Sequence, residues 1–248
     1  MIEVSQLHKS FGQQQVLCGV DLQIDEGESI VIIGGSGCGK SVLLRHIIGL
    51  VQPDKGDVKI DGQGIANLSE RELIKVRRKF GMLFQGSALF DSLTVEENVG
   101  FLLDREQTMP PAAIRETVAD ALELVDLGGT QAKKPAELSG GMKKRVGLAR
   151  AIVYKPEIIL YDEPTTGLDP VVADSIDQLV IKMRDQLKCT TIVVTHDTRS
   201  MRRVGNRVML LHHGRIHANG TPEEIFNSTD PIVHKFVNGI ADPKDLEF

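Results

Sequence analysis

A glycine-rich segment after a short apolar run constrains the fold of this chain more than any other feature. The segment is Gly34-Gly35-Ser36-Gly37-Cys38-Gly39-Lys40-Ser41, which matches the pattern G-x-x-x-x-G-K-[ST] in full. Small residues let consecutive backbone N–H groups turn inward around phosphate oxygens, and the positive end of the following helix adds to the attraction. We expect Lys40 to reach the β- and γ-phosphates and the Ser41 hydroxyl to ligate Mg²⁺. A chance glycine-rich turn is the alternative, but the predicted strand at 29–33 and helix at 40–51 are the setting that this motif requires.

Strand-like and helical patterns alternate along the rest of the chain. Further runs typical of strands lie at 2–4, 16–24, 58–62, 157–161, 190–194 and 207–211. Helical spacing marks 113–127 and 171–187. This alternation predicts an α/β core with a parallel sheet. We expect one domain over 1–248, with a core at 1–84 and 150–230, a mainly helical part at 85–149 and a tail at 231–248.

The composition excludes several classes of protein function. The 248 residues carry a formal net charge of -5 and no Trp, so neither a global basic field nor base stacking favours nucleic acid as a partner. The apolar runs fall far short of the roughly 18–20 residues that span a bilayer. Three irregularly spaced cysteines fit a reducing compartment. We therefore expect a cytosolic globular protein without a membrane span and without a signal peptide.

Two carboxylates follow the apolar run at 158–161. Asp162 and Glu163 end this predicted strand, and open parallel sheets place their ligand chemistry at the carboxyl ends of strands. We expect Asp162 to hold Mg²⁺ and Glu163 to contact the attacking water. An ordinary acidic strand end is the alternative, which the presence of the glycine-rich segment disfavours.

A second candidate for anion binding is Ser139-Gly140-Gly141, directly before a segment with helical spacing at 143–153. Ser139 suits an N-cap, and the glycines leave backbone N–H groups accessible at the start of the helix. Taken alone, a capped helix start is the better interpretation.

The order of these motifs resembles the nucleotide-binding subunit of an ABC transporter. In chain order they are the glycine-rich segment, Gln85, 138–141, 158–163, 167–169 and His196, and the resemblance covers residues 2 to about 226. It implies a RecA-like P-loop NTPase core with an N-terminal antiparallel β subdomain and an inserted α-helical subdomain. It also implies an ATPase that uses ATP and Mg²⁺, and a head-to-tail homodimer in which Ser139, Gly140 and Gly141 complete the ATP site of the partner.

The resemblance assigns roles to single residues. Phe11 is similar to the aromatic residue that stacks on adenine, although Tyr is commoner there. Gln85 resembles the glutamine that senses Mg²⁺ and water, and Asp169 the residue that contacts the opposite subunit. His196 resembles the switch histidine near the γ-phosphate, although a lone histidine at a strand end is more often structural. With Lys40 and Glu163, Gln85 and His196 make up the expected catalytic set.

Two residues depart from the family pattern. Val42 replaces the usual Thr after Lys-Ser, and Met142 replaces the usual Gln after Leu-Ser-Gly-Gly. Neither change removes a contact to phosphate, metal or water, so Val42 stays in the expected nucleotide site and the ATPase prediction stands.

Other segments indicate a subtype. Residues 84–99, the basic run 143–145 after Ser-Gly-Gly-Met and the ending 236–242 are similar to bacterial lipid-trafficking ATPases of the Mla/Mce type. This similarity implies phospholipid movement between membranes, a separate integral membrane permease, an Mce-type lipid-binding accessory protein, and a place on the cytoplasmic face of the inner membrane. The alternatives are the ATPase of an amino-acid or ion importer and a soluble ABC ATPase outside transport. A P-loop kinase is disfavoured because no motif for a second substrate is present.

Overall fold

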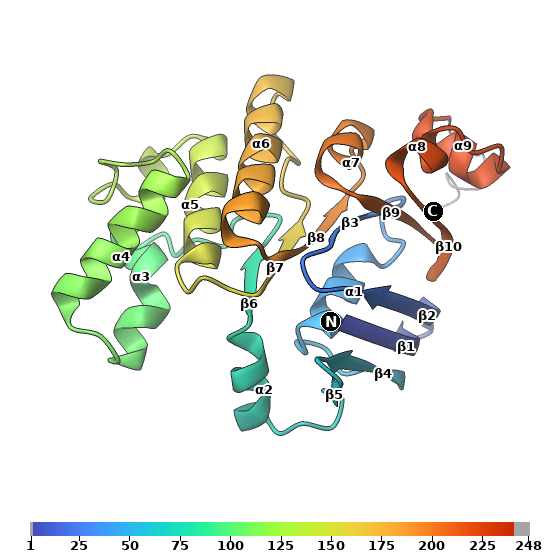
Figure 1. Cartoon of the computed structure of the whole chain (residues 1–248), viewed down its shortest axis with the longest axis horizontal. Coiled ribbons are helices and arrows are strands. Elements are labelled where there is room, and N and C mark those ends of the chain that lie inside the picture. The colour runs from blue at the N-terminus through green and yellow to red at the C-terminus, as the bar shows by residue number, and fades with distance from the viewer. Residues whose placement is uncertain (1, 241–248) are drawn as a thin grey trace. The chain divides into compact units, whose positions relative to one another are not determined.

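The computed structural model describes residues 2–240, which form two compact units (Figure 1). Unit 1 holds described residues 2–77 and 191–240, and unit 2 holds residues 78–190. No helix within 2–240 is long and apolar enough to cross a membrane. Residues 241–248 of the predicted tail, including the last two of the ending 236–242, lie outside the described residues.

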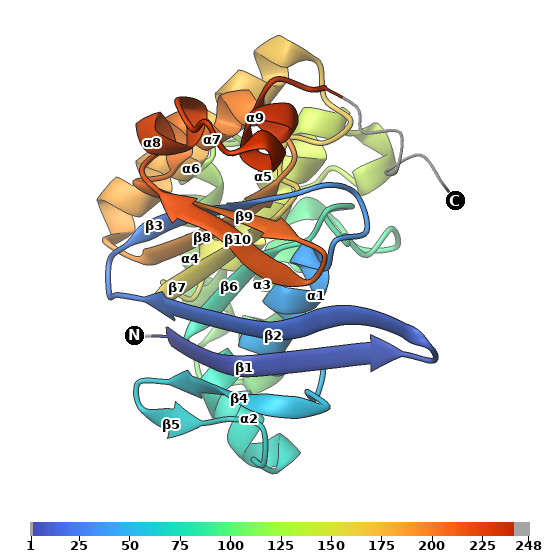
Figure 2. The same ribbon diagram turned by 90° about the vertical axis from the view of Figure 1, so that its right-hand side faces the viewer.

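An antiparallel sheet opens unit 1. Its strands are β1 (Ile2–Phe11), β2 (Gln14–Ile24), β4 (Lys55–Ile60) and β5 (Gln63–Gly64), in the order β2-β1-β4-β5 (Figure 2). Ile2 and Val4 lie on one face of β1 and are buried, and Leu7 is buried after a register shift between Val4 and Leu7. The predicted N-terminal antiparallel β part is confirmed.

A second set of strands in unit 1 carries the glycine-rich segment. β3 (Ser29–Ile33) pairs in parallel with β8 (Thr190–Thr195) and with β9 (Arg207–His212), which forms a hairpin with β10 (Arg215–Gly220). All five residues of β3 are buried, as expected for a strand with neighbours on both sides and cover on both faces. β3 therefore ends deep in unit 1.

Five helices lie in the described part of unit 1. They are α1 (Lys40–Ile47), α2 (Glu70–Arg77), α7 (Thr198–Val204), α8 (Pro222–Phe226) and α9 (Pro231–Val237). α1 ends four residues before the predicted position 51, because Gly49 takes a left-handed conformation with φ 70°. The chain then closes with Leu50 N–H donating to Arg45 O at 2.8 Å, which satisfies a carbonyl at the end of the helix.

Unit 2 combines two parallel strands with helices. β6 (Phe80–Leu83) pairs with β7 (Ile158–Asp162). The helices are α3 (Val95–Glu106), α4 (Pro111–Leu124), the short 3₁₀ turn η1 (Pro135–Glu137), α5 (Gly140–Ile152) and α6 (Pro170–Leu187). Figure 1 shows α3, α4 and α5 in green, packed on one another. Local signals set the helix starts: Thr94 and Glu97 form a capping box at α3, and α4 begins at Pro111.

Candidate functional site

The glycine-rich segment joins β3 to α1 in unit 1, as predicted. Gly37 and Gly39 have φ values of 76° and 106°, which residues with a side chain rarely adopt. A Cβ on Gly34 would lie 2.4 Å from Leu211 O and 2.6 Å from Cys38 Sγ, so only glycine fits at the exit from β3. The loop is thus held in a fixed, tightly turned conformation directly before the N-terminus of α1, which favours negative charge.

Lys40 is the first residue of α1, and its side chain folds back over the loop. Its Nζ donates to Gly34 O at 2.8 Å and to Gly35 O at 3.0 Å, and only 7% of the residue is exposed. A buried ammonium beside the inward-facing backbone of the loop supplies a fixed positive charge. This arrangement suits the recognition of phosphate oxygens.

Strand register brings His196 to the same sheet edge. Ile33 pairs with Thr195 of β8 in parallel register, so Gly34 and His196 are the next residues at adjacent strand ends. His196 is exposed and directly precedes Asp197, the N-cap of α7. Within unit 1 the fold thus places the predicted switch histidine beside the start of the glycine-rich loop.

A cavity of about 1000 Å³ adjoins the loop in unit 1. It is lined by loop residues 35–38, by the start of β2, by the β9–β10 turn and by α9. Phe11 is half exposed at the end of β1, with Lys9 Nζ 5.6 Å from its ring centre, and it is not among the lining residues. The structure therefore leaves the predicted adenine contact of Phe11 untested.

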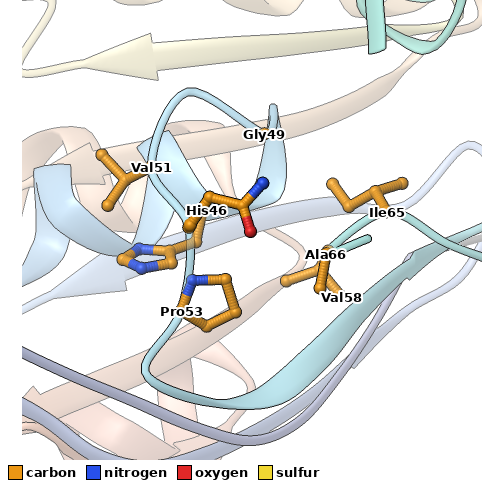
Figure 3. A pocket seen from close by; sticks show the side chains of 8 residues that line it. His46, Gly49, Val51, Pro53, Val58, Ile65 and Ala66 are labelled. Carbon is orange, nitrogen blue, oxygen red and sulfur yellow. The ribbon is translucent and has the colours of Figure 1, made fainter. Parts of the chain in front are cut away.

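A second, small pocket lies behind α1 and beside His46 (Figure 3). The imidazole is buried, and its Nδ1 lies 2.8 Å from Val42 O. Because a carbonyl only accepts, Nδ1 carries the proton. Burial lowers the pKa of His46, which keeps the ring neutral. The pocket is too small for a nucleotide, and His46 supports the helix that follows the loop.

The predicted carboxylates close β7 in unit 2. Asp162 is 3% exposed and Glu163 is 7% exposed. The Thr166 hydroxyl donates to Glu163 Oε2 at 2.9 Å, which orients that carboxylate. Glu163 has a φ of 51°, a left-handed conformation that costs free energy for a residue with a side chain. Strained backbone of this kind gathers at functional sites.

Gln85 lies two residues beyond β6, at the same sheet edge as Glu163. Leu83 pairs with Tyr161 in parallel register, so Gln85 and Glu163 both stand two residues further along their strands. Unit 2 therefore places Gln85, which is predicted to sense Mg²⁺ and water, at the same end of the strands as Asp162 and Glu163.

Lys144 on α5 connects these two residues. Its Nζ donates to Gln85 O and, at 3.1 Å, to Glu163 O. The residue is 5% exposed. Burial lowers the pKa of the Lys144 ammonium, and the Asp162 and Glu163 carboxylates oppose that shift. The motifs in the sequence did not predict this contact. Helical spacing does place Lys144 on the buried face of α5, with Gly141 and Leu148.

The predicted second anion-binding segment is a capped helix start. Ser139 is the N-cap of α5, and its hydroxyl accepts from Met142 N–H at 3.3 Å. A Cβ on Gly141 would lie 2.6 Å from Val172 Cγ1 of α6, so this glycine permits close packing between the two helices. Gly140 and Ser139 are exposed and leave the helix N-terminus accessible.

Asp169 has a local task in addition to any contact with a second subunit. It is the N-cap of α6, and its Oδ1 accepts from Val171 N–H at 3.0 Å and from Val172 N–H at 3.1 Å. Beside it, Val171 is 79% exposed. The role predicted for Asp169 toward another subunit stays a prediction.

Comparisons with known proteins agree with this arrangement. A family model described as "ABC transporter" matches residues 17–166. The chain is 42% identical to the probable ribonucleotide transport ATP-binding protein mkl of Mycobacterium leprae, over 96% of this chain and 69% of that protein. It is 38% identical to the intermembrane phospholipid transport system ATP-binding protein MlaF of Haemophilus influenzae, over 98% of this chain and 92% of that protein.

A solved structure shares the fold. The dimeric post-hydrolysis state of the ATP-binding cassette MJ0796, bound to ADP and phosphate, superposes with a TM-score of 0.82 and 35% identity, over 90% of this chain and 99% of that chain. The α/β P-loop fold predicted from the sequence is confirmed. The chain therefore belongs to the ABC transporter family, as an ATP-binding subunit that hydrolyses ATP.

Proposed function

We propose that this ATPase powers a separate membrane permease that moves phospholipid between bacterial membranes. The observation that carries the proposal is the likeness to MlaF, which spans nearly the whole of both chains. The matched length includes two features that indicate the lipid subtype: the segment at 84–99, and Met142 after Ser-Gly-Gly.

The site residues would act on ATP as follows. The loop at 34–41 binds the phosphates through backbone N–H groups, and Lys40 neutralises charge on the β- and γ-phosphates. Glu163 orients the attacking water or accepts its proton. His196 contacts the γ-phosphate from the neighbouring strand end. Phe11 stacks on the adenine, and Val42 lies beside the nucleotide at the third position of α1.

The donor set fits Mg²⁺. Ser41 offers a hydroxyl, Asp162 a carboxylate and Gln85 an amide oxygen, and hard oxygen ligands of this kind suit Mg²⁺. No group of three or more His, Cys, Asp or Glu gathers for a metal in residues 2–240. Mg²⁺ does not require one, because it keeps several waters and takes its other ligands from substrate phosphates. When bound, the ion would neutralise the charge that develops on the transferred phosphoryl group.

The subunit is proposed to act as a head-to-tail homodimer on the cytoplasmic face of the inner membrane. Ser139, Gly140 and Gly141 would then complete the ATP site of the partner, and Asp169 would contact it. The exposed N-terminus of α5 supports this role, as does the dimeric state of MJ0796. The permease and an Mce-type lipid-binding protein complete the proposed assembly, and nucleic acid has no part in it.

Hydrolysis is tested with Glu163→Gln. The variant should bind MgATP with an affinity close to wild type, lose at least about 100-fold in kcat and favour a closed dimer in size-exclusion chromatography. Unchanged hydrolysis in this variant would refute the role of Glu163. Thr166→Val, which removes the hydroxyl that orients the carboxylate, should lose less activity.

The cargo is tested by purifying the complex from detergent-solubilised native membranes. Co-purification with a multispanning protein and a lipid-binding protein that carries phospholipid is the expected result. Co-purification of a periplasmic protein that binds amino acids or ions would instead indicate that the cargo is a small solute and would contradict the lipid proposal. The name of the mkl relative suggests ribonucleotides as another cargo, which the same purification would reveal as bound nucleotide.

A further inference from the structure

Helix α5 presents two cations to one stretch of backbone. Lys144 donates to Gln85 O, and Arg150 donates through Nη2 to Ser87 O at 2.6 Å and through Nη1 to Ala88 O at 2.7 Å. The segment that follows β6 is thus fixed to α5 by its carbonyl groups. A Cβ on Gly147, between the two cations, would lie 3.3 Å from Ser87 Cβ, so the helix and the segment are in close contact.

The backbone held in this way is strained at three positions. Ser87, Ala88 and Glu163 have φ values of 61°, 48° and 51°. Left-handed conformations are uncommon for residues with a side chain and persist only where surrounding contacts enforce them. Here charged hydrogen bonds from α5 reach the carbonyl oxygens of all three residues. α5 therefore enforces the backbone conformation of the segments that follow β6 and β7.

Lys144 differs from the other cations of unit 2 that bind backbone. Lys182 also donates to a carbonyl, Leu124 O at 2.9 Å, but 37% of its side chain is exposed and it pairs with Asp126 on a surface turn. Lys144 is almost completely buried, and its two carbonyl partners belong to different strand ends. A single ammonium therefore fixes the distance between the Gln85 backbone and the Glu163 backbone.

We propose that Lys144 is a positioning residue that couples Gln85 to Glu163. The ammonium holds both carbonyl groups at once, so a displacement of the segment 85–88 changes the position of the Glu163 backbone and carboxylate. The inference rests on the proposed role of Glu163 in hydrolysis. Lys144 also links Glu163 to α5, the helix that Ser139 caps. The start of this helix would face the ATP of a partner, so the same helix would also set the geometry of the Glu163 carboxylate.

The test compares Lys144→Met with Lys182→Met in the full-length chain. Methionine keeps an unbranched apolar side chain, one atom shorter than that of lysine, but donates no hydrogen bond. With MgATP as substrate, Lys144→Met should lose about 10- to 100-fold in kcat while KM stays within about twofold, because misplacement of a reacting group affects the chemical step. Lys182→Met should lower the melting temperature and leave kcat unchanged. Wild-type kcat in Lys144→Met, or a change confined to KM, would overturn the proposal.

A second variant separates the hydrogen bond from general packing. Lys144→Gln keeps an N–H donor on a shorter side chain, so its kcat should lie between those of wild type and Lys144→Met. Equal kcat values in the two variants would show that the donor is irrelevant and would overturn the proposal. If Lys144→Met melts below the assay temperature, Lys144→Gln against wild type decides by the same kcat and KM criteria.

A double mutant distinguishes this inference from the proposed function. In a Glu163→Gln chain, adding Lys144→Met should lower kcat by less than threefold, since residues that act through one group are not additive. A full additional 10- to 100-fold loss would overturn the coupling. If Glu163→Gln itself keeps wild-type activity, the proposed role of Glu163 fails. If it loses activity and Lys144→Met does not, only the Lys144 inference fails.

Discussion

Asn98 offers a quantitative test of how the segment after β6 is held in place. It is fully buried in the first turn of α3. Its Oδ1 accepts from Phe90 N–H at 2.8 Å, and its Nδ2 lies within hydrogen-bond distance of Phe90 O at 3.1 Å, Leu93 O at 3.2 Å and Thr94 O at 2.9 Å. One amide side chain thus fixes the connection that runs from Gln85 to α3.

The expected loss for Asn98→Ala follows from these contacts. Phe90 O keeps a donor in Leu93 N–H at 3.1 Å, and Thr94 O keeps one in Asn98 N–H at 2.9 Å. Phe90 N–H and Leu93 O lose the partners described above, and each such group costs about 1–3 kcal/mol when buried. Alanine returns roughly 0.5 kcal/mol through its better helix propensity. Because Phe90 is exposed and Leu93 is only partly buried, each lost partner costs about 1–2 kcal/mol, and the free energy of unfolding should fall by about 1.5–3.5 kcal/mol.

The assay is urea unfolding followed by far-UV circular dichroism, because the chain has no Trp for fluorescence. Hydrogen exchange of the peptide that contains Phe90 adds a local measurement, and protection of that amide should disappear in Asn98→Ala. Asn98→Asp is the matched variant: it keeps the acceptor for Phe90 N–H but places a carboxylate against three carbonyl oxygens. It should be less stable than Asn98→Ala at pH 7. A loss below about 1 kcal/mol for Asn98→Ala, or a more stable Asn98→Asp, would refute the reasoning.

Three further predictions concern the loop, a cap and a buried histidine. Gly34→Ala should weaken ATP binding more than 10-fold, because its Cβ would lie 2.4 Å from Leu211 O; Gly35→Ala, with open space around its Cβ, should lose less in the same binding assay. Ser139→Ala should cost about 1 kcal/mol in thermal unfolding through the lost N-cap bond, and an unchanged melting temperature would contradict that. Because burial lowers the pKa of His46, the unfolded chain takes up a proton that the folded chain resists, so stability should fall as the pH drops below about 6.5, by at most about 1.4 kcal/mol per pH unit from this group. The unfolding free energy of His46→Gln should lack this part of the slope between pH 7 and 5, and equal slopes would argue against it.

Local signals predicted much of the fold. The strand at 29–33, the glycine-rich loop and the helix predicted at 113–127, which is α4 at Pro111–Leu124, have the expected types, since backbone sterics and helix caps act over a few residues. The helix after the loop was predicted too long, because the left-handed Gly49 was not recognised as its end.

Which residues distant in sequence lie close together was harder to predict. Strand order and register decide that His196 stands beside Gly34 and that Gln85 stands level with Glu163, and both depend on pairing across many residues. The resemblance to a known family supplied the roles of these residues, whereas the periodicity of the strands did not. The sequence did not indicate that Lys144 and Asn98 hold backbone segments in place, because a charged or polar residue on a helix is usually solvated.

The sequence by itself determined the phosphate-binding loop, the acidic strand end and the family, because each depends on residue types at fixed short spacing. Tertiary structure alone decided that a lysine of α5 binds the backbone of both Gln85 and Glu163. A buried ammonium is stable only where hydrogen-bond acceptors or opposite charges converge on it. That convergence arises from packing α5 against the ends of β6 and β7, which no local pattern in the chain contains.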